Sequence, residues 1–329
     1  MSSTTDGVLR ALIEAGGESL SGEKLAELLG VSRAAVWKSV KALEAEGYEI
    51  SGQRGRGYSI LSGPEVLRAG AISARLTTSL MGCEVRHFQE ADSTNRQCSR
   101  WGEEGAPEGA LVVADHQLSG RGRLGRSWHD DLGESLMMSL LLRPKVELSR
   151  APLLTFVAAV ALAETLANWV DEKRLEIKWP NDLLIGGRKI SGILLESRIE
   201  ATRLDFVVLG MGVNVRGSTD NFPDEIKASA TTLEAEGGEG VSRLELLAGF
   251  LERFEELYLS FCNEGFGPIK ERWDRWFKMV GEEVRVTGGG NVITGVVREL
   301  SGAGALILEN EGELLPVHAG ELSRLTTRL

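Results

Sequence analysis

Apolar and polar positions follow three different periodicities along the chain, which predicts three domains. Over the first sixty or so residues, apolar residues recur at helical spacing and then alternate with polar ones in two short runs. The middle of the chain mixes short apolar runs with longer helical segments, and after about residue 280 only short runs separated by glycine-rich turns remain. We therefore expect domains at residues 1–63, 64–279 and 280–329.

The first part has the pattern of a winged helix-turn-helix. Three helices are expected, the second between Ser21 and Gly30 and the third at residues 33–46, with Ser32 as its N-cap. A β-hairpin with its tip near residues 53–56 should follow. Two helices joined by a short glycine-containing turn and followed by such a hairpin are typical of a winged helix-turn-helix.

Basic residues are concentrated on the two elements of this part that would meet DNA. Residues 1–62 hold eight acidic and seven basic side chains, whereas the whole chain has a net charge of −11. That total argues against binding nucleic acid through bulk charge, but it leaves room for a local basic surface. Winged helices also serve as protein-interaction modules, and the placement of the bases favours DNA. The candidate DNA-binding residues are Arg33, Trp37, Lys38, Lys41, Arg54 and Arg56.

The middle and last parts predict a sheet with helices and then a small β-barrel. Central strands are expected at residues 85–88, 109–114, 135–142, 175–179, 192–197 and 206–215. Helices are expected after the polar residues 92–95 and at residues 71–80, 152–170, 244–261 and 269–277. Because strands and helices do not alternate regularly, the pattern indicates an α+β domain. The last part has expected strands at residues 283–287, 292–300, 305–308 and 314–317.

Composition excludes several classes of protein and site. A chain of 329 residues with 42% hydrophobic and 26% charged residues is typical of a globular protein with two or three domains. No apolar run approaches the ~20 residues of a membrane helix, and the polar N-terminus is not a signal peptide. The cysteines are odd in number and scattered, which predicts a reducing cytoplasm without disulfides. Neither the cysteines nor the histidines have the spacing of metal ligands. These residues are Cys83, Cys98, Cys262, His87, His116, His129 and His318.

The candidate chemistry lies in one loop and two later segments. Residues 117–128 hold three glycines, three arginines and one tryptophan. Glycine lets the backbone approach a ligand closely, and arginine presents a planar, permanently charged fork to carboxylate or phosphate. A solvated basic loop would have the same composition. Two further stretches favour a ligand site: Lys-Trp-Pro-Asn-Asp at residues 178–182 and Arg-Lys-Ile-Ser-Gly-Ile-Leu-Leu-Glu at residues 188–196.

These three stretches give the chain a resemblance to the biotin–protein ligases. The Gly-Arg-Gly-Arg-x-Gly-Arg-x-Trp loop, the Lys-Trp-Pro-Asn-Asp run and the Lys-x-x-Gly-Ile-Leu-x-Glu strand occur in that family's order and approximate spacing. Residues 32–38 resemble the recognition helix of the bifunctional bacterial form, which is both ligase and biotin-operon repressor. The resemblance implies an α+β fold in three domains. They are a winged helix-turn-helix, a central mixed sheet like that of class II aminoacyl-tRNA synthetases with helices against one face, and an SH3-like barrel.

The activity implied by the resemblance has two half-reactions. The carboxylate of biotin attacks the α-phosphorus of ATP to give biotinyl-5′-adenylate and pyrophosphate, and a lysine of a biotin carboxyl carrier protein then displaces AMP. Mg²⁺ would accompany the triphosphate, held largely by phosphate oxygens and water, with no metal site of the protein's own. Operator DNA and a ligand-promoted homodimer are the other expected partners, and no membrane is expected.

The resemblance also implies the site residues. Lys189 and Arg123 would bring carboxylate and phosphate together, Lys178 would lie near the phosphates, and Asp182 would assist deprotonation of the acceptor lysine. The expected biotin pocket contains Ser93, Thr94, Asn95, Gln117, Gly120, Arg121, Gly122, Arg123, Lys189 and Gly192. The expected nucleotide side contains Arg126, Trp128, Asn181 and Asn214. For Asn214, a purely structural role in a turn at the end of a strand is nearly as good an interpretation. The polar segment from there to about residue 232 departs from the family pattern, and no residue in it is assigned.

Two other functions fit parts of the sequence. A lipoate–protein ligase would share the central fold, but the arginine loop and the fused winged helix weigh against it. A noncatalytic, ligand-sensing transcription factor would not need the cations of the site, yet Arg121, Arg123, Lys178 and Lys189 are all present.

Overall fold

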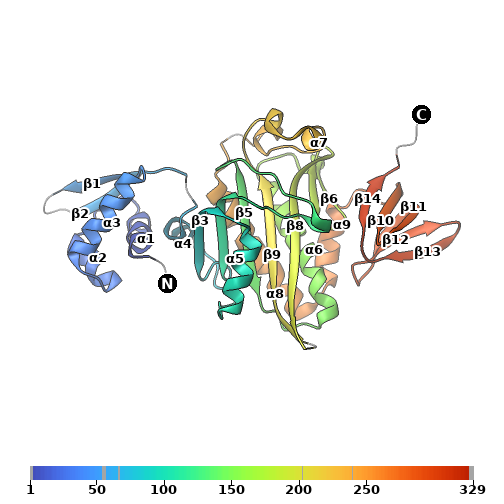
Figure 1. Ribbon diagram of the computed structural model, residues 1–329, viewed down its shortest axis with the longest axis horizontal. Coiled ribbons are helices and arrows are strands. Elements are labelled where there is room, and N and C mark those ends of the chain that lie inside the picture. Colours follow the sequence, from blue (N-terminus) through green and yellow to red (C-terminus); the bar gives the residue numbers. More distant parts are fainter. Residues whose placement is uncertain (1–2, 54–56, 66, 202, 239, 326–329) are drawn as a thin grey trace.

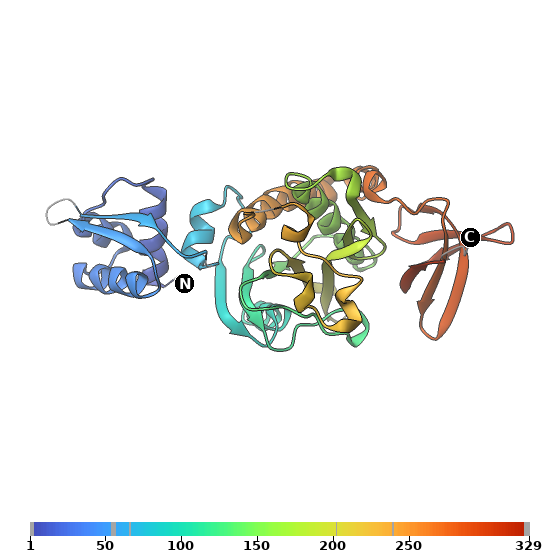
Figure 2. The same cartoon turned by 90° about the horizontal axis from the view of Figure 1, so that it is seen from above.

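Three structural parts lie in a row along the long axis of the molecule (Figures 1 and 2). The computed structural model describes residues 3–53, 57–65, 67–201, 203–238 and 240–325. A helical part with a two-stranded hairpin forms one end, a seven-stranded sheet with helices forms the middle, and a five-stranded sheet forms the other end. The predicted α+β class is confirmed.

The N-terminal part is the predicted three helices and hairpin. The helices are α1 (Thr4–Glu14), α2 (Gly22–Leu29) and α3 (Arg33–Ala45), and the hairpin strands are β1 (Glu49–Gln53) and β2 (Gly57–Ser62). The side-chain oxygens of Ser21 and Ser32 accept the N-cap hydrogen bonds from Lys24 and Ala35, and Gly30 ends α2 with a φ of 63°. A small core joins the three helices, formed by Val8, Leu12, Leu25, Val36, Val40 and Leu43.

The central sheet is mixed and has the strand order β3-β4-β5-β9-β8-β7-β6. Only β3 and β4 pair in parallel, and the other neighbours are antiparallel. The long antiparallel pair β8–β9 lies near the middle. The strands are β3 (Val85–Ala91), β4 (Leu111–Gln117), β5 (Ser135–Leu142), β6 (Leu175–Lys178), β7 (Asp182–Ile185), β8 (Arg188–Glu200) and β9 (Arg203–Asn214).

Helices cover both faces of this sheet, so the expectation of helices against one face was wrong. Residues such as Val113, Ile193 and Val213 pack with α6 (Leu154–Leu166), α8 (Arg243–Glu264) and α9 (Gly267–Trp276). On the opposite face, α5 (Thr94–Glu103) buries Cys98 and Trp101 against Val112, Leu141, Phe206 and Val208. Successive strand residues point to opposite faces, and the short amphipathic α5 is enough to cover part of the second face. The rest of that face is left for the loop after β4, which crosses in front of β9 and β8 in Figure 1.

Several expected boundaries were also wrong. The helix expected at residues 71–80 is α4 (Ala69–Arg75), because the backbone turns extended at Leu76. The helix expected from Pro152 begins as a 3₁₀ turn at Leu148–Leu153, and α6 proper starts afterwards. Strand β7, helix α7 (Asp224–Lys227) and strand β14 (Glu321–Arg324) were not predicted. In the described part of the chain, Leu148–Leu166 alone has the length and apolarity of a membrane span, and 67% of it is buried inside the protein.

The C-terminal part is an antiparallel sheet packed against the central part. Its strand order is β13-β12-β11-β10-β14, with β10 at Glu283–Gly288, β11 at Asn291–Leu300, β12 at Leu306–Asn310 and β13 at Glu313–Val317. Its core residues belong to the same apolar cluster as those of α6 and α9. The indole Nε1 of the buried Trp179 donates to the carbonyl oxygen of Gly304 at 3.3 Å. This packing holds β14 next to the segment that follows β6.

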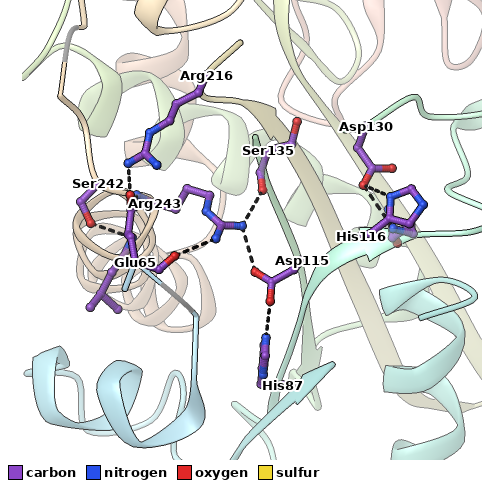
Figure 3. Close-up of polar contacts among 11 residues, drawn as sticks. Glu65, His87, Asp115, His116, Asp130, Ser135, Arg216, Ser242 and Arg243 are labelled. Carbon is purple, nitrogen blue, oxygen red and sulfur yellow. Dashed lines mark hydrogen bonds and ion pairs between the residues drawn. The ribbon is translucent and has the colours of Figure 1, made fainter. Parts of the chain in front are cut away.

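A buried polar cluster anchors the chain directly after the N-terminal part to the central one (Figure 3). Arg243, at the start of α8, is 3% exposed, and its guanidinium lies 3.0 Å from Asp115 Oδ1 and donates to the carbonyl oxygen of Glu65 at 3.1 Å. The carboxylate of Glu65, in the connection between the two parts, also pairs with Arg216 just beyond β9. His87 Nε2 lies 2.7 Å from Asp115 Oδ2. Residues far apart in the sequence are thereby held at one place.

Candidate active site

A cavity of about 440 Å³ lies where the loop after β4, the strands β7 and β8, and the start of β14 meet. We call the segment 118–128 the arginine loop. Its Arg123, together with Lys178, Asp182 and Lys189, lines this cavity. The structure thus brings together the four residues that the sequence suggested for catalysis.

The cations of the cavity are only partly paired. Lys189 Nζ lies 2.7 Å from Asp182 Oδ1, but outside hydrogen-bonding geometry, so that this buried oxygen accepts no hydrogen bond from the described residues. Arg123 donates to Asn181 Oδ1 at 3.0 Å. Burial lowers the pKa of Arg123 despite the nearby carboxylates of Asp182 and Glu321, although a guanidinium stays charged. Such incompletely neutralised, partly desolvated cations are suited to binding anionic groups.

A β-bulge explains how Lys189 reaches the cavity beside Gly192. The register of the β7–β8 pair shifts, with Leu183 opposite Ser191 but Leu184 opposite Lys189, so that Ile190 is the extra residue. In a regular strand, residues 189 and 192 would point to opposite faces. The bulge re-aims the side chain of Lys189, and both residues line the cavity.

A second, narrower cavity of about 30 Å³ adjoins the first and holds most of the expected biotin pocket. Gln117 Oε1 accepts hydrogen bonds from the backbone N–H of Thr94, at 2.8 Å, and from its hydroxyl, at 3.1 Å. Ser139 Oγ lies 2.8 Å from Thr94 Oγ1 and 2.6 Å from Asn95 Oδ1. The side chain of Ser93, 2% exposed, makes no N-cap hydrogen bond. A closely spaced set of donors and acceptors therefore lines a small buried space at the start of α5.

Trp128 forms the boundary between the two cavities and lines both. Its ring lies over Gly192 and Gly212, where an added Cβ would come within 3.0 and 2.6 Å of ring atoms. Lys189 Nζ is 5.5 Å from the ring centroid, a cation–π distance. The indole Nε1 is buried and has no hydrogen-bond partner among the described residues. Trp128, expected on the nucleotide side, therefore also borders the small cavity.

The other residues of the arginine loop have different environments. Arg121 pairs with Glu196 at 2.8 Å, and Glu196 also accepts from Asn95 at 2.7 Å. Gly120 has no room for a side chain, because an added Cβ would lie 2.7 Å from the carbonyl oxygen of Trp128. The N–H of Gly122 donates to the carbonyl oxygen of Arg126 at 2.7 Å, which closes the loop on itself.

Arg126 is held by a residue from the C-terminal part. Its guanidinium forms two hydrogen bonds with the carboxylate of Glu321, at the start of β14, one of them 2.7 Å long. Hydrogen bonding to Arg126 lowers the pKa of Glu321, whose charge also faces Lys178 and Lys189. No sequence pattern indicated Glu321, because it lies almost two hundred residues from the loop.

Asn214, expected on the nucleotide side, lines the large cavity from the end of β9. Its side chain is buried and donates to the carbonyl oxygen of Thr231 at 3.0 Å. The segment between these residues supplies part of the cavity wall through Phe222, Ile226, Ser229 and Ala230. Sequence reasoning assigned none of them.

Asp130 is another residue that the sequence did not indicate. Its carboxylate accepts from the backbone N–H of Gln117 and lies 3.1 Å from His116 Nδ1. Burial raises the pKa of Asp130 against the effect of these contacts. The contact fixes the strand end that presents Gln117 to the small cavity.

No protein-only metal site is found in the described ranges, where no three His, Cys, Asp or Glu side chains converge. Asp182 and Glu321 are the carboxylates in the wall of the large cavity. A hard divalent cation there would need most of its ligands from a bound phosphate and water.

The candidate DNA-binding face lies at the opposite end of the molecule. Arg33, Trp37, Lys38 and Lys41 are exposed along α3, and Trp37 is 56% exposed although it is large and apolar. Arg54 and Arg56 lie outside the described residues. These four exposed residues therefore place three basic side chains and one large aromatic side chain on α3.

Comparison with known proteins identifies relatives over the whole length. Residues 87–214 match the biotin/lipoate A/B protein ligase family, residues 6–59 an HTH domain family, and residues 280–325 the biotin protein ligase C-terminal domain family. The bifunctional ligase/repressor BirA of Bacillus subtilis is 38% identical over 91% of this chain and 92% of that protein. BirA of Escherichia coli is 31% identical over 94% of each.

A solved structure agrees with these relatives. The biotin protein ligase from Aquifex aeolicus in complex with biotin and ATP aligns with a TM-score of 0.64 and 32% identity. The alignment covers 74% of this chain and all of that one.

Proposed function

This chain belongs to the biotin protein ligase family, in the form that carries a helix-turn-helix domain, and from that we propose that it is a bifunctional enzyme and repressor. As an enzyme it joins biotin to ATP and transfers biotin from the adenylate to a lysine of a biotin carboxyl carrier protein. The observation that carries the proposal is the pair of adjoining cavities, with Lys189 in the larger one and near the ring of Trp128 that separates them. A small polar pocket suits the ureido ring of biotin, and the larger cationic one suits a nucleotide.

Adenylate formation requires two anionic groups to approach each other, so the first half-reaction is assigned to the cations. We propose that Lys189 and Arg123 contact the biotin carboxylate and the α-phosphate, and that Lys178 neutralises the leaving pyrophosphate. Asn181 orients Arg123 through its 3.0 Å hydrogen bond. The hydrophobic wall of Trp128 over Gly192 and Gly212 would exclude water from the mixed anhydride.

The second half-reaction needs a base for the incoming ammonium group. Asp182 is the proposed base, because it lines the cavity and its Oδ1 accepts no hydrogen bond from the described residues. The ammonium group of Lys189, 2.7 Å from Asp182 Oδ1, offsets the negative charge of this carboxylate until the adenylate is in place. The other carboxylate in the wall, Glu321, already pairs with Arg126 and is less suited to accept a proton.

Mg²⁺ fits the site only as a companion of the nucleotide. Asp182 is the carboxylate of the cavity wall that could hold the ion, because Glu321 is paired with Arg126, and the remaining ligands would come from phosphate and water. When bound, the ion would supply charge neutralisation at the triphosphate. The roles proposed for Lys189, Arg123 and Lys178 do not depend on a bound metal ion.

The repressor function is assigned to α3 and to the hairpin of β1 and β2, the wing of the winged helix-turn-helix. Two such surfaces on a homodimer would fit a two-fold operator, and we propose that the adenylate favours this dimer. We also propose domain boundaries at residues 63/64 and 279/280 and a cytoplasmic location, where the three free cysteines would stay reduced. Sedimentation at one protein concentration should show more dimer with biotin plus ATP than without, and an unchanged monomer–dimer balance would refute the coupling.

The enzymatic proposal is tested by ATP–pyrophosphate exchange with biotin or lipoate as the acid. We expect exchange that depends on biotin. Exchange with lipoate alone would make the chain a lipoate ligase, and exchange with neither would make it a sensor without activity.

A further inference from the structure

The wall of the large cavity between β9 and α8 has little regular structure of its own. It holds 3₁₀ turns at Thr219–Asn221 and Glu234–Glu236 and the single-turn helix α7. We call residues 218–236 the wall segment. A segment of this kind owes its position to contacts with its neighbours rather than to a core of its own.

The wall segment is attached by its backbone to Lys189. The N–H of Lys189 donates to the carbonyl oxygen of Ser229 at 2.7 Å, and the N–H of Thr231 donates back to the carbonyl oxygen of Lys189 at 2.9 Å. Ser229 and Ala230 line the cavity. A shift of the wall segment would therefore act on both the cavity shape and the backbone of Lys189.

A buried carboxylate reinforces this attachment from behind. The side chain of Glu236 is 1% exposed and forms ion pairs with Arg188, the first residue of β8, and with Arg174, just before β6. It also accepts a hydrogen bond from Thr231 Oγ1 at 2.7 Å. One carboxylate thus connects the end of the wall segment to the residue preceding Lys189.

Glu236 does not line the cavity, so it has no direct contact with a ligand there. Its loss would leave two guanidinium groups close together and the hydroxyl of the fully buried Thr231 without its acceptor. Two guanidinium groups without a carboxylate between them, and a buried hydroxyl without an acceptor, would destabilise the packing of the wall segment on β8. The wall segment would then move away from β8, and the nucleotide side would lose more of its shape than the biotin side.

We propose that Glu236 is a positioning residue that holds the wall segment on β8 and thereby sets the affinity for ATP. The inference rests on the proposed function, in which ATP occupies the large cavity. It predicts an effect that is selective for one of two substrates, whereas a residue that only stabilises the fold would affect neither in the folded enzyme.

The test compares Glu236→Gln with Glu164→Gln in the exchange assay. Glu164 is a matched control, because this carboxylate also pairs with two arginines, Arg253 and Arg272, but none of these residues lines the cavity. For Glu236→Gln we expect the KM for ATP to rise about tenfold and the KM for biotin to stay within about twofold of wild type. Glu164→Gln should leave both values unchanged, whatever it does to Tm.

A second variant covers the case in which Glu236→Gln does not fold. Thr231→Val keeps the side-chain shape and removes only the hydroxyl that Glu236 accepts from, so the KM for ATP should rise about threefold, with KM for biotin unchanged. If the folded variants keep a KM for ATP within about twofold of wild type, or if KM for biotin rises equally, the inference is wrong. Absence of biotin-dependent exchange in the wild type would instead refute the proposed function.

Discussion

Two clusters of charged side chains in this molecule differ in how far they are buried and in how many protein partners surround each arginine or lysine. At the junction of the N-terminal and central parts, the buried Arg243 contacts Asp115 and Glu65 within the protein. In the large cavity, Arg123 and Lys189 have neutral or single partners and border open space. The same residue types therefore stabilise the fold where they are buried among several partners of opposite charge, and are available to a ligand where they border a cavity.

The largest effect should come from breaking the junction cluster. Replacing Arg243 by methionine (Arg243→Met) leaves Asp115 buried with its charge less compensated, which should cost about 3–5 kcal/mol of unfolding free energy. Urea unfolding measures this cost, and the rate of adenylate formation by the folded enzyme should change little. A stability like that of wild type would show that the cluster is not structural.

The next largest effect should come from the cavity. Lys189→Ala removes one oriented cation from the charge that develops between carboxylate and α-phosphate, which should raise the barrier by about 2.7–4 kcal/mol. Single-turnover formation of the adenylate measures the loss. Lys145→Ala, which removes an exposed lysine beyond the far end of β5, is the control and should have no effect.

Acid should weaken the junction cluster through Asp115. Burial alone would raise the pKa of Asp115, but the hydrogen bond from His87 and the charges of His87 and Arg243 hold that pKa below its ordinary value. A lowered pKa contributes stability that is complete above the unfolded-state pKa of about 3.9 and is lost as the pH falls through the lower folded-state value. Unfolding free energy measured from pH 6 downward should therefore fall less steeply in Asp115→Asn than in wild type. Parallel curves would contradict this assignment.

The smallest effect should come from the exposed pair between the arginine loop and β14. Arg126 is 63% exposed at its side chain, and such pairs contribute about 0–1 kcal/mol to stability. Glu321→Gln also removes a negative charge that faces Lys178 and Lys189. We expect KM for ATP to fall, by at most about threefold. A rise in that KM would mean that Glu321 supports nucleotide binding.

Local signals predicted the parts of the site that lie in one stretch of sequence. The arginine loop, Lys178 to Asp182 and Lys189 to Glu196 were recognisable because their residue types and spacing form a pattern. The winged helix-turn-helix was predicted from capping serines and glycine turns that act within a few residues.

Residues that join distant segments left no such pattern. Glu236, Glu321, Arg243 and Asp130 each depend on a partner brought close only by the fold. The bulge at Ile190 was equally hidden, because it arises from the register between two strands. A periodicity over four residues is weak evidence: of the strands of this length, β6 was predicted and β7 and β14 were not.

We expect the cations of the cavity to act in chemistry and those of the junction in folding. This division of roles is tested most directly by measuring both the unfolding free energy and the single-turnover rate of adenylate formation for Lys189→Ala and Arg243→Met. We predict that Lys189→Ala slows adenylate formation by roughly 10²–10³ with a small change in stability, and that Arg243→Met does the reverse. If both variants lose rate and stability together, the two clusters are not separate in function and the account is wrong.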